Sequence, residues 1–96
     1  MSRFTTRVEL YGNPNYEDYN HLHSAMQAKG FIRTITVQDN KILMLPHAEY
    51  SFDGSGETTA VLNLTKTAAF PVWKDFAVLV TKTEVTREWY NLKEVK

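Results

Sequence analysis

Histidine is the side chain most often used for proton transfer and metal binding near neutral pH, and this chain has three: His21, His23 and His47. His21 and His23 lie in a segment with helical periodicity, where residues two apart are separated by about 200° around the helix axis. They therefore cannot chelate one ion together, and we expect both to face solvent or to pack. His47 is distant from them in the sequence and completes no metal-binding spacing.

Two pairs of carboxylates are close enough in the sequence for acid–base catalysis: Glu17 with Asp18, and Glu49 with Asp53. The first pair lies at the start of a predicted helix, where the helix dipole favours negative charge. Asp53 precedes Gly54, which is common in turns. We therefore assign helix and turn roles to these acids. The loop at residues 53–56 lacks the glycine spacing and the Lys-Ser/Thr ending of a phosphate-binding loop.

Aromatic side chains that alternate with basic residues are typical of surfaces that stack on RNA bases. The candidates here are Tyr50, Phe52, Trp73, Trp89 and Tyr90. The overall charge does not favour such a surface, because 11 Lys and Arg residues balance 11 Asp and Glu residues, whereas general nucleic-acid binders are basic. We therefore favour packing in the core or in a homodimer for these aromatic residues.

The composition predicts one globular domain, residues 1–96, because 43% of the residues are hydrophobic and the length suffices for a single core. The sequence contains no cysteine, which excludes disulfides and cysteine-ligated zinc. We expect no metal and no cofactor. Residues 1–8 lack the apolar stretch of a signal peptide, and no run of 18 apolar residues occurs. These features predict a cytoplasmic protein that does not span a membrane.

In the first half of the chain, residues 3–11 alternate as in a half-buried strand. Residues 12–14 end this strand, and either Asn13 or Asn15 can cap a helix that ends at Gly30. The expected inward face of the strand is Phe4, Thr6, Val8 and Leu10, and that of the helix is Tyr16, Tyr19, Leu22 and Met26.

In the second half, residues 31–37 and 42–45 predict a hairpin that turns at residues 38–41. Its second strand continues towards Phe52, either as an edge strand or with a break at Pro46, which lacks a backbone donor. A second helix, capped by Ser55 or Thr58, buries Val61, Leu64 and Ala68. Residues 76–80 are a central strand, and residues 87–95 are an optional further strand that folds back on it.

This order of elements predicts an α+β fold, a ferredoxin-like split βαβ sandwich in which an antiparallel sheet carries two helices on one face. The opposite face then has no covering layer. A chain of this size often buries such a face against a second copy, so we expect a homodimer.

Four stretches of the chain resemble a small bacterial family grouped with the GhoS antitoxin: residues 3–10, residues 16–23 of the predicted helix with Met26 and the Gly30-Phe31 pair, residues 45–50, and residues 77–81 followed by Trp89 and Tyr90. GhoS is a ferredoxin-like endoribonuclease that destroys the messenger RNA of its toxin and is akin to small CRISPR-associated nucleases. The resemblance therefore implies an RNA-directed regulatory role.

The chain departs from those nucleases at the end of the first strand, where they commonly carry a metal-binding aspartate. This chain has Leu10, Tyr11, Gly12 and Asn13 there. Cleavage of RNA would then be metal-independent, and the candidate catalytic residues are Arg7, Arg33, His47 and Tyr50.

The alternative is a non-catalytic module that binds or inhibits another protein, for example a phage-encoded inhibitor of a host defence complex. The neutral charge favours this alternative, and the resemblance favours the ribonuclease. The expected partners are accordingly RNA or a protein, besides a second copy of the chain.

Overall fold

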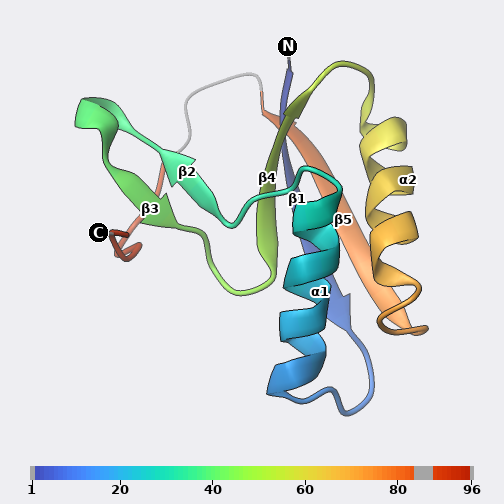
Figure 1. Ribbon diagram of the computed structural model, residues 1–96. Helices are drawn as coiled ribbons and strands as arrows, with labels where there is room; N and C mark the ends of the chain where they lie inside the picture. The colour runs from blue at the N-terminus through green and yellow to red at the C-terminus, as the bar shows by residue number, and fades with distance from the viewer. Residues whose placement is uncertain (1, 84–87, 96) are drawn as a thin grey trace.

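Strands and helices follow one another in the predicted order in a computed structural model, which describes residues 2–83 and 88–95 (Figure 1). The elements are β1 (Ser2–Leu10), α1 (Tyr16–Ala28), β2 (Thr34–Thr36), a short 3-10 turn (Gln38–Asn40), β3 (Ile42–Met44), β4 (Glu49–Gly54), α2 (Thr58–Ala69) and β5 (Phe76–Thr83).

The main sheet has three antiparallel strands in the order β4-β1-β5, and both helices lie on one of its faces (Figure 1). The central strand is β1, so the central position predicted for residues 76–80 is wrong: within the described residues, β5 pairs with β1 alone. After α1 the chain returns to the outer side of β4, where Ile32 and Ser51 exchange backbone hydrogen bonds of 2.9 and 2.7 Å. Strand β4 thus lies between β1 and the segment that follows α1. The α+β, ferredoxin-like split βαβ prediction is confirmed.

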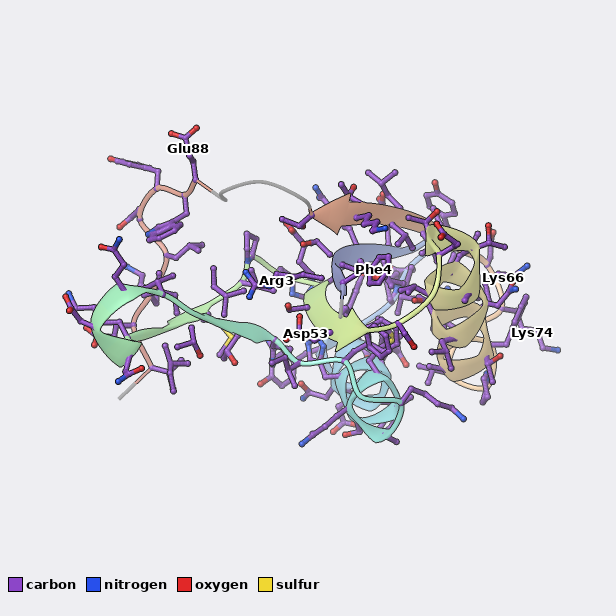
Figure 2. The ribbon with its side chains drawn as sticks, turned by 90° about the horizontal axis from the view of Figure 1, so that it is seen from above. Arg3, Phe4, Asp53, Lys66, Lys74 and Glu88 are labelled. Carbon is purple, nitrogen blue, oxygen red and sulfur yellow. The ribbon has the colours of Figure 1, made fainter. Side chains whose placement is uncertain are left out.

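The predicted hairpin forms, but most of it leaves the main sheet. β2 and β3 pair as a separate two-stranded sheet, which extends to one side of the helices (Figure 2). The pairing breaks beside Pro46, where Ala48 takes a left-handed conformation with φ 60°. The second of the two alternatives, a break at Pro46, is therefore the one observed. Ile35, Leu43 and Leu45 form a small core of their own in this sheet.

The C-terminal segment pairs with β3, whereas we expected it to pair with β5. Glu94 bridges Leu43, and the backbone N–H groups of Met44 and Val95 donate to Lys93 and Ile42, both at 2.8 Å. Arg87 and the turn before it lie outside the described residues. The correction has a physical reason, because the separate hairpin offers the segment both an open strand edge and an apolar contact through Leu92. Trp89 and Tyr90 are 49% and 91% exposed and lie outside the core.

Helix α1 begins with a capping box at Asn15 and not at Asn13. The Asn15 side chain accepts from Asp18 N at 2.9 Å, and the Asp18 carboxylate accepts from Asn15 N at 2.8 Å. Leu22 and Met26 are buried as expected. Tyr16 is 80% exposed, contrary to the prediction, because packing against the sheet begins at Tyr19.

Helix α2 begins at Thr58 after an N-cap at Glu57, which makes no side-chain capping bond, so neither predicted cap, Ser55 or Thr58, is used. Its buried face includes Val61 and Ala68, as predicted. Together the helices and the inward face of β1 enclose one core. The largest fully buried side chain in this core belongs to Tyr50.

Candidate functional site

Tyr50 connects the centre of the sheet to helix α1. It lies on β4 opposite Thr6 and is fully buried on the helix-covered face. Its hydroxyl is 2.6 Å from Nδ1 of His23, a short hydrogen bond between side chains 27 positions apart. One turn earlier on α1, the Tyr19 hydroxyl accepts from the backbone N–H of Leu10 at 3.1 Å. The phenols of Tyr19 and Tyr50 thus fix α1 to the sheet, and Tyr50 orients the His23 ring.

His47 reaches the same place from the loop between β3 and β4. Its ring centroid is 4.4 Å from that of Tyr19 and 6.1 Å from that of His23, edge-on to the latter. Two backbone hydrogen bonds fix this loop. Ala48 O accepts from Val8 N of β1 at 3.0 Å, and Pro46 O accepts from Glu49 N at 3.1 Å, which closes the turn around His47. The exposed His47 imidazole is therefore positioned against α1 by a fixed backbone.

Arg33 comes from the segment that follows α1. Its backbone carbonyl accepts from Leu45 N at 2.8 Å, next to the paired Ile32 and Ser51. Its guanidinium acts electrostatically on both His23 and Tyr50. We call His23, Arg33, His47 and Tyr50, with the Tyr19 ring, the histidine cluster.

Burial sets the protonation of this cluster. The pKa of His23 is lowered to about 4, first by burial and then by the electrostatic influence of Arg33 and His47. Burial also raises the pKa of Tyr50 well above its ordinary value, and Arg33 only partly opposes this shift. Both groups are neutral at pH 7. We assign the phenol as donor to Nδ1 because it is the more acidic group, which places the His23 ring proton on Nε2.

The lowered pKa of His23 predicts that the protein loses stability in mild acid. The unfolded chain protonates this ring near pH 6.5 and the folded chain only near pH 4, so the contribution is complete above pH 6.5 and is lost as the pH falls towards 4. Because solvent reaches part of the ring, we expect a loss of about 1–2 kcal/mol.

Urea unfolding of the wild type and of His23→Gln between pH 7 and pH 4 measures this contribution. Glutamine does not titrate and all other groups are common to both proteins, so the difference between the two pH profiles isolates His23. We expect the wild type to lose more stability than the variant. The exposed residue His21 supplies the matched control His21→Gln. Parallel pH profiles for the wild type and His23→Gln would contradict the assignment.

The structure brings three of the predicted site residues together and leaves the fourth apart. Arg33, His47 and Tyr50 share the histidine cluster, whereas Arg7 is exposed on the opposite face of the sheet, where its strand neighbours are Glu49 and Leu79. Successive residues of a strand point to opposite faces. Arg7 therefore belongs to the face of the sheet that the helices do not cover.

The sequence predicts that His23 faces solvent or packs, and it does pack, against Tyr50, but it does not indicate that His23 belongs to the candidate site. The helical argument that separates it from His21 holds, because His21 is exposed. The available signal was a different spacing. His23 follows Tyr19 by four residues, so both lie on the same side of α1.

Two members of the histidine cluster, His23 and Arg33, line a surface groove of about 250 Å³ between α1 and the segment that follows it. The lining residues are His23, Ser24, Gln27, Phe31, Ile32 and Arg33. An imidazole, a guanidinium and a neutral amide thus line one groove together with the exposed apolar side chain of Ile32. Such a set can donate hydrogen bonds to a phosphate.

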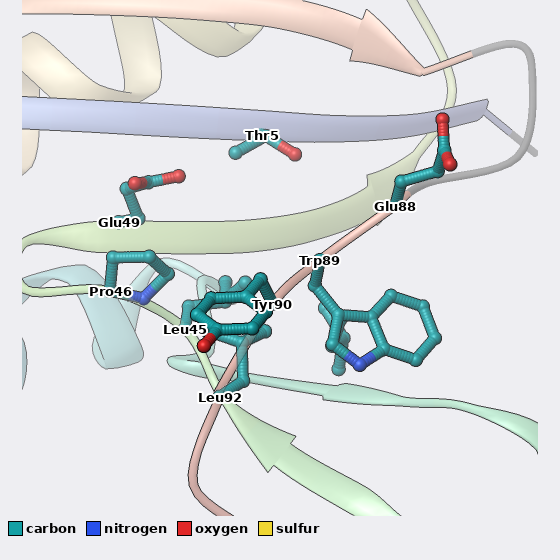
Figure 3. A pocket seen from close by; sticks show the side chains of 9 residues that line it. Thr5, Leu45, Pro46, Glu49, Glu88, Trp89, Tyr90 and Leu92 are labelled. Atoms are coloured by element: carbon teal, nitrogen blue, oxygen red, sulfur yellow. The ribbon is translucent and has the colours of Figure 1, made fainter.

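A second groove, of about 310 Å³, lies on the other face of the sheet, between β1, β4 and the separate hairpin (Figure 3). Glu49 and Glu88 lie at its two ends, and the rings of Trp89 and Tyr90 lie along its side. It shares no lining residue with the first groove. Its aromatic and acidic lining suits a protein surface better than a phosphate.

Within residues 2–83 and 88–95, no three His, Cys, Asp or Glu side chains lie close enough to hold a metal ion. In the same part of the chain, no helix is long and apolar enough to cross a bilayer. Comparison of the chain with known protein families, with curated proteins and with solved structures found no match.

Proposed function

We propose that this chain is a metal-independent endoribonuclease of the GhoS kind. The arrangement of three side chains carries the proposal: the rings of His23 and His47 lie 6.1 Å apart, and His23 shares a surface groove with Arg33. Imidazoles beside a guanidinium are the groups needed to cleave RNA with side chains alone.

In the proposed reaction the exposed His47 removes the proton from a ribose 2′-hydroxyl. The 2′-oxygen forms a bond to the adjacent phosphorus, and the bond from phosphorus to the 5′-oxygen breaks. That oxygen takes a proton from water, and the resulting hydroxide takes the proton that His47 has accepted, which leaves a 2′,3′-cyclic phosphate, a 5′-hydroxyl and a neutral His47. Arg33 and the Nε2–H of His23 donate to the phosphate oxygens as charge develops there.

The hydrogen bond from Tyr50 is what gives His23 this role. A neutral imidazole with Nδ1 occupied presents a single N–H donor at Nε2. The lowered pKa of His23 keeps the ring neutral at pH 7, so the donor stays oriented without a second charge beside Arg33. We therefore treat Tyr50 as a positioning residue.

The resemblance of the sequence to the GhoS family and the ferredoxin-like fold support the same proposal. The implied substrate, messenger RNA, fits the expectation of a cytoplasmic protein. The net charge of zero implies weak general affinity for RNA, because the protein neutralises few phosphates. For the same reason, we expect RNA binding to weaken only slightly as the salt concentration rises.

The experiment is incubation of purified protein with mixed single-stranded and structured RNA, with and without EDTA, over a range of salt concentrations. We expect cleavage that EDTA does not abolish. No binding and no cleavage at any salt concentration would refute the ribonuclease.

A second candidate function, a protein-binding module, is favoured by the groove in Figure 3. Trp89 beside this groove is about half exposed and Tyr90 almost fully exposed, and such residues are common in protein interfaces. A pull-down with the wild type and with Tyr90→Ala separates this candidate from the first. A partner captured by the wild type and lost in Tyr90→Ala favours binding, whereas the ribonuclease does not depend on Tyr90.

We further propose that the uncovered face of the sheet packs against a second copy of the chain. Leu79 on β5 is 67% exposed on this face. The same face carries arginines from β1 and carboxylates from β4, so the arginines of one copy can pair with the carboxylates of the other. Sedimentation equilibrium measures the mass directly, and a monomer at all concentrations would exclude the dimer.

A further inference from the structure

The groove beside the histidine cluster has two chemically different walls. Ser24 and Gln27 come from α1, three residues apart and so on one side of the helix. Phe31 and Ile32 line the groove from the segment that follows α1. Phe31 is almost fully buried, so the apolar surface open to a ligand belongs to Ile32, which is 51% exposed although its backbone is paired with Ser51. An exposed apolar side chain thus faces a hydroxyl and an amide across a fixed hollow.

A ligand that matches these walls is flat, with an apolar face and a polar edge. A nucleobase has this character, and RNA is recognised in sequence-specific complexes through unpaired bases whose edges are hydrogen-bonded. The groove volume of about 250 Å³ leaves room for one such ring system with water. Arg33 lines the same groove, so a phosphate attached to that base would lie beside the guanidinium.

We propose that this groove is a subsite for one unpaired base next to the cleaved phosphate, and that Gln27 makes it prefer adenine. The proposal rests on the ribonuclease proposed above and adds its substrate preference. A glutamine amide offers one donor and one acceptor side by side, which match N7 and the N6 amino group of adenine. The Ser24 hydroxyl donates or accepts with any base and adds no preference.

The test compares four fluorescent oligonucleotides that differ only in the base beside the cleavage position. We expect the wild type to cleave the adenine substrate about tenfold faster than the others, in keeping with about 1–3 kcal/mol for a bidentate contact. Gln27→Ala is expected to remove this preference. The matched control is Gln38→Ala, which removes the same amide from an exposed position at the hairpin tip.

A second measurement separates failure of the subsite from failure of the ribonuclease. Titration of ¹⁵N-labelled protein with AMP and with CMP is expected to shift the amide signals of Gln27 and Ile32 more strongly with AMP. Cleavage without base preference would overturn the subsite and leave the ribonuclease standing. If no RNA is cleaved, the ribonuclease falls. In that case equal or absent shifts with the two nucleotides overturn the subsite as well.

Discussion

Replacing His47 with alanine is expected to lower the rate of RNA cleavage by about 10²- to 10⁴-fold, the usual contribution of a general base. His47 is exposed, and its loop is held by backbone hydrogen bonds from Val8 and Glu49 that the substitution leaves in place. The loss should therefore be catalytic and not a consequence of unfolding. Single-turnover cleavage with a labelled RNA measures the rate.

The matched control for this prediction is His21→Ala, which removes an exposed histidine from α1 away from the cluster. Its cleavage rate should stay within about twofold of the wild type, since surface substitutions outside a site have small effects. Equal losses in the two variants, or normal cleavage by His47→Ala, would remove His47 from the mechanism.

Replacing Tyr50 with alanine is expected to cost about 3–5 kcal/mol of unfolding free energy, the range for deleting a large buried aromatic side chain. Tyr50 is fully buried at the centre of the core, with its hydroxyl bonded to His23. Because small domains have only about 5–15 kcal/mol in total, this variant will be close to unfolding at room temperature. Urea denaturation followed by circular dichroism measures the change.

The conservative variant Tyr50→Phe separates packing from the hydrogen bond. It keeps the ring and removes the hydroxyl, so we expect a cost of only about 0.5–1.5 kcal/mol. Cleavage should nevertheless fall, because the His23 ring loses the bond that fixes its tautomer. An unchanged rate and an unchanged pH profile for Tyr50→Phe would show that Tyr50 is structural only.

Local patterns predicted most of the fold, because the periodicity of each element reflects its burial. The alternation of Phe4, Thr6, Val8 and Leu10 identified the inward face of β1, and all four are buried. Tyr16 failed this logic because an apolar residue in a helical stripe packs only where the neighbouring sheet extends. The partner of the C-terminal segment was also wrong, since pairing with β3 or β5 depends on which strand edge is open in three dimensions.

The sequence indicated several residues of the candidate site but not which of them lie together in the folded chain. Arg33, His47 and Tyr50 meet because α1 and two connections place them there, and nothing in their sequence spacing shows it. Arg7 is among the candidate catalytic residues named from the sequence. The alternation of β1, however, already predicts that its side chain lies on the face of the sheet opposite to that of Val8. His23 was missed because the helical argument compared it with His21 alone. Its partner, Tyr50, lies 27 residues further along the chain.

The measurement that tests the central claim most directly is the chemical identity of the RNA ends that the wild-type protein produces in EDTA. A reaction driven by His47 beside Arg33 and His23 yields 2′,3′-cyclic phosphates and 5′-hydroxyls, because the ribose oxygen is the nucleophile. Products with 5′-phosphates and 3′-hydroxyls would contradict this account, since they require water as the nucleophile and a different site.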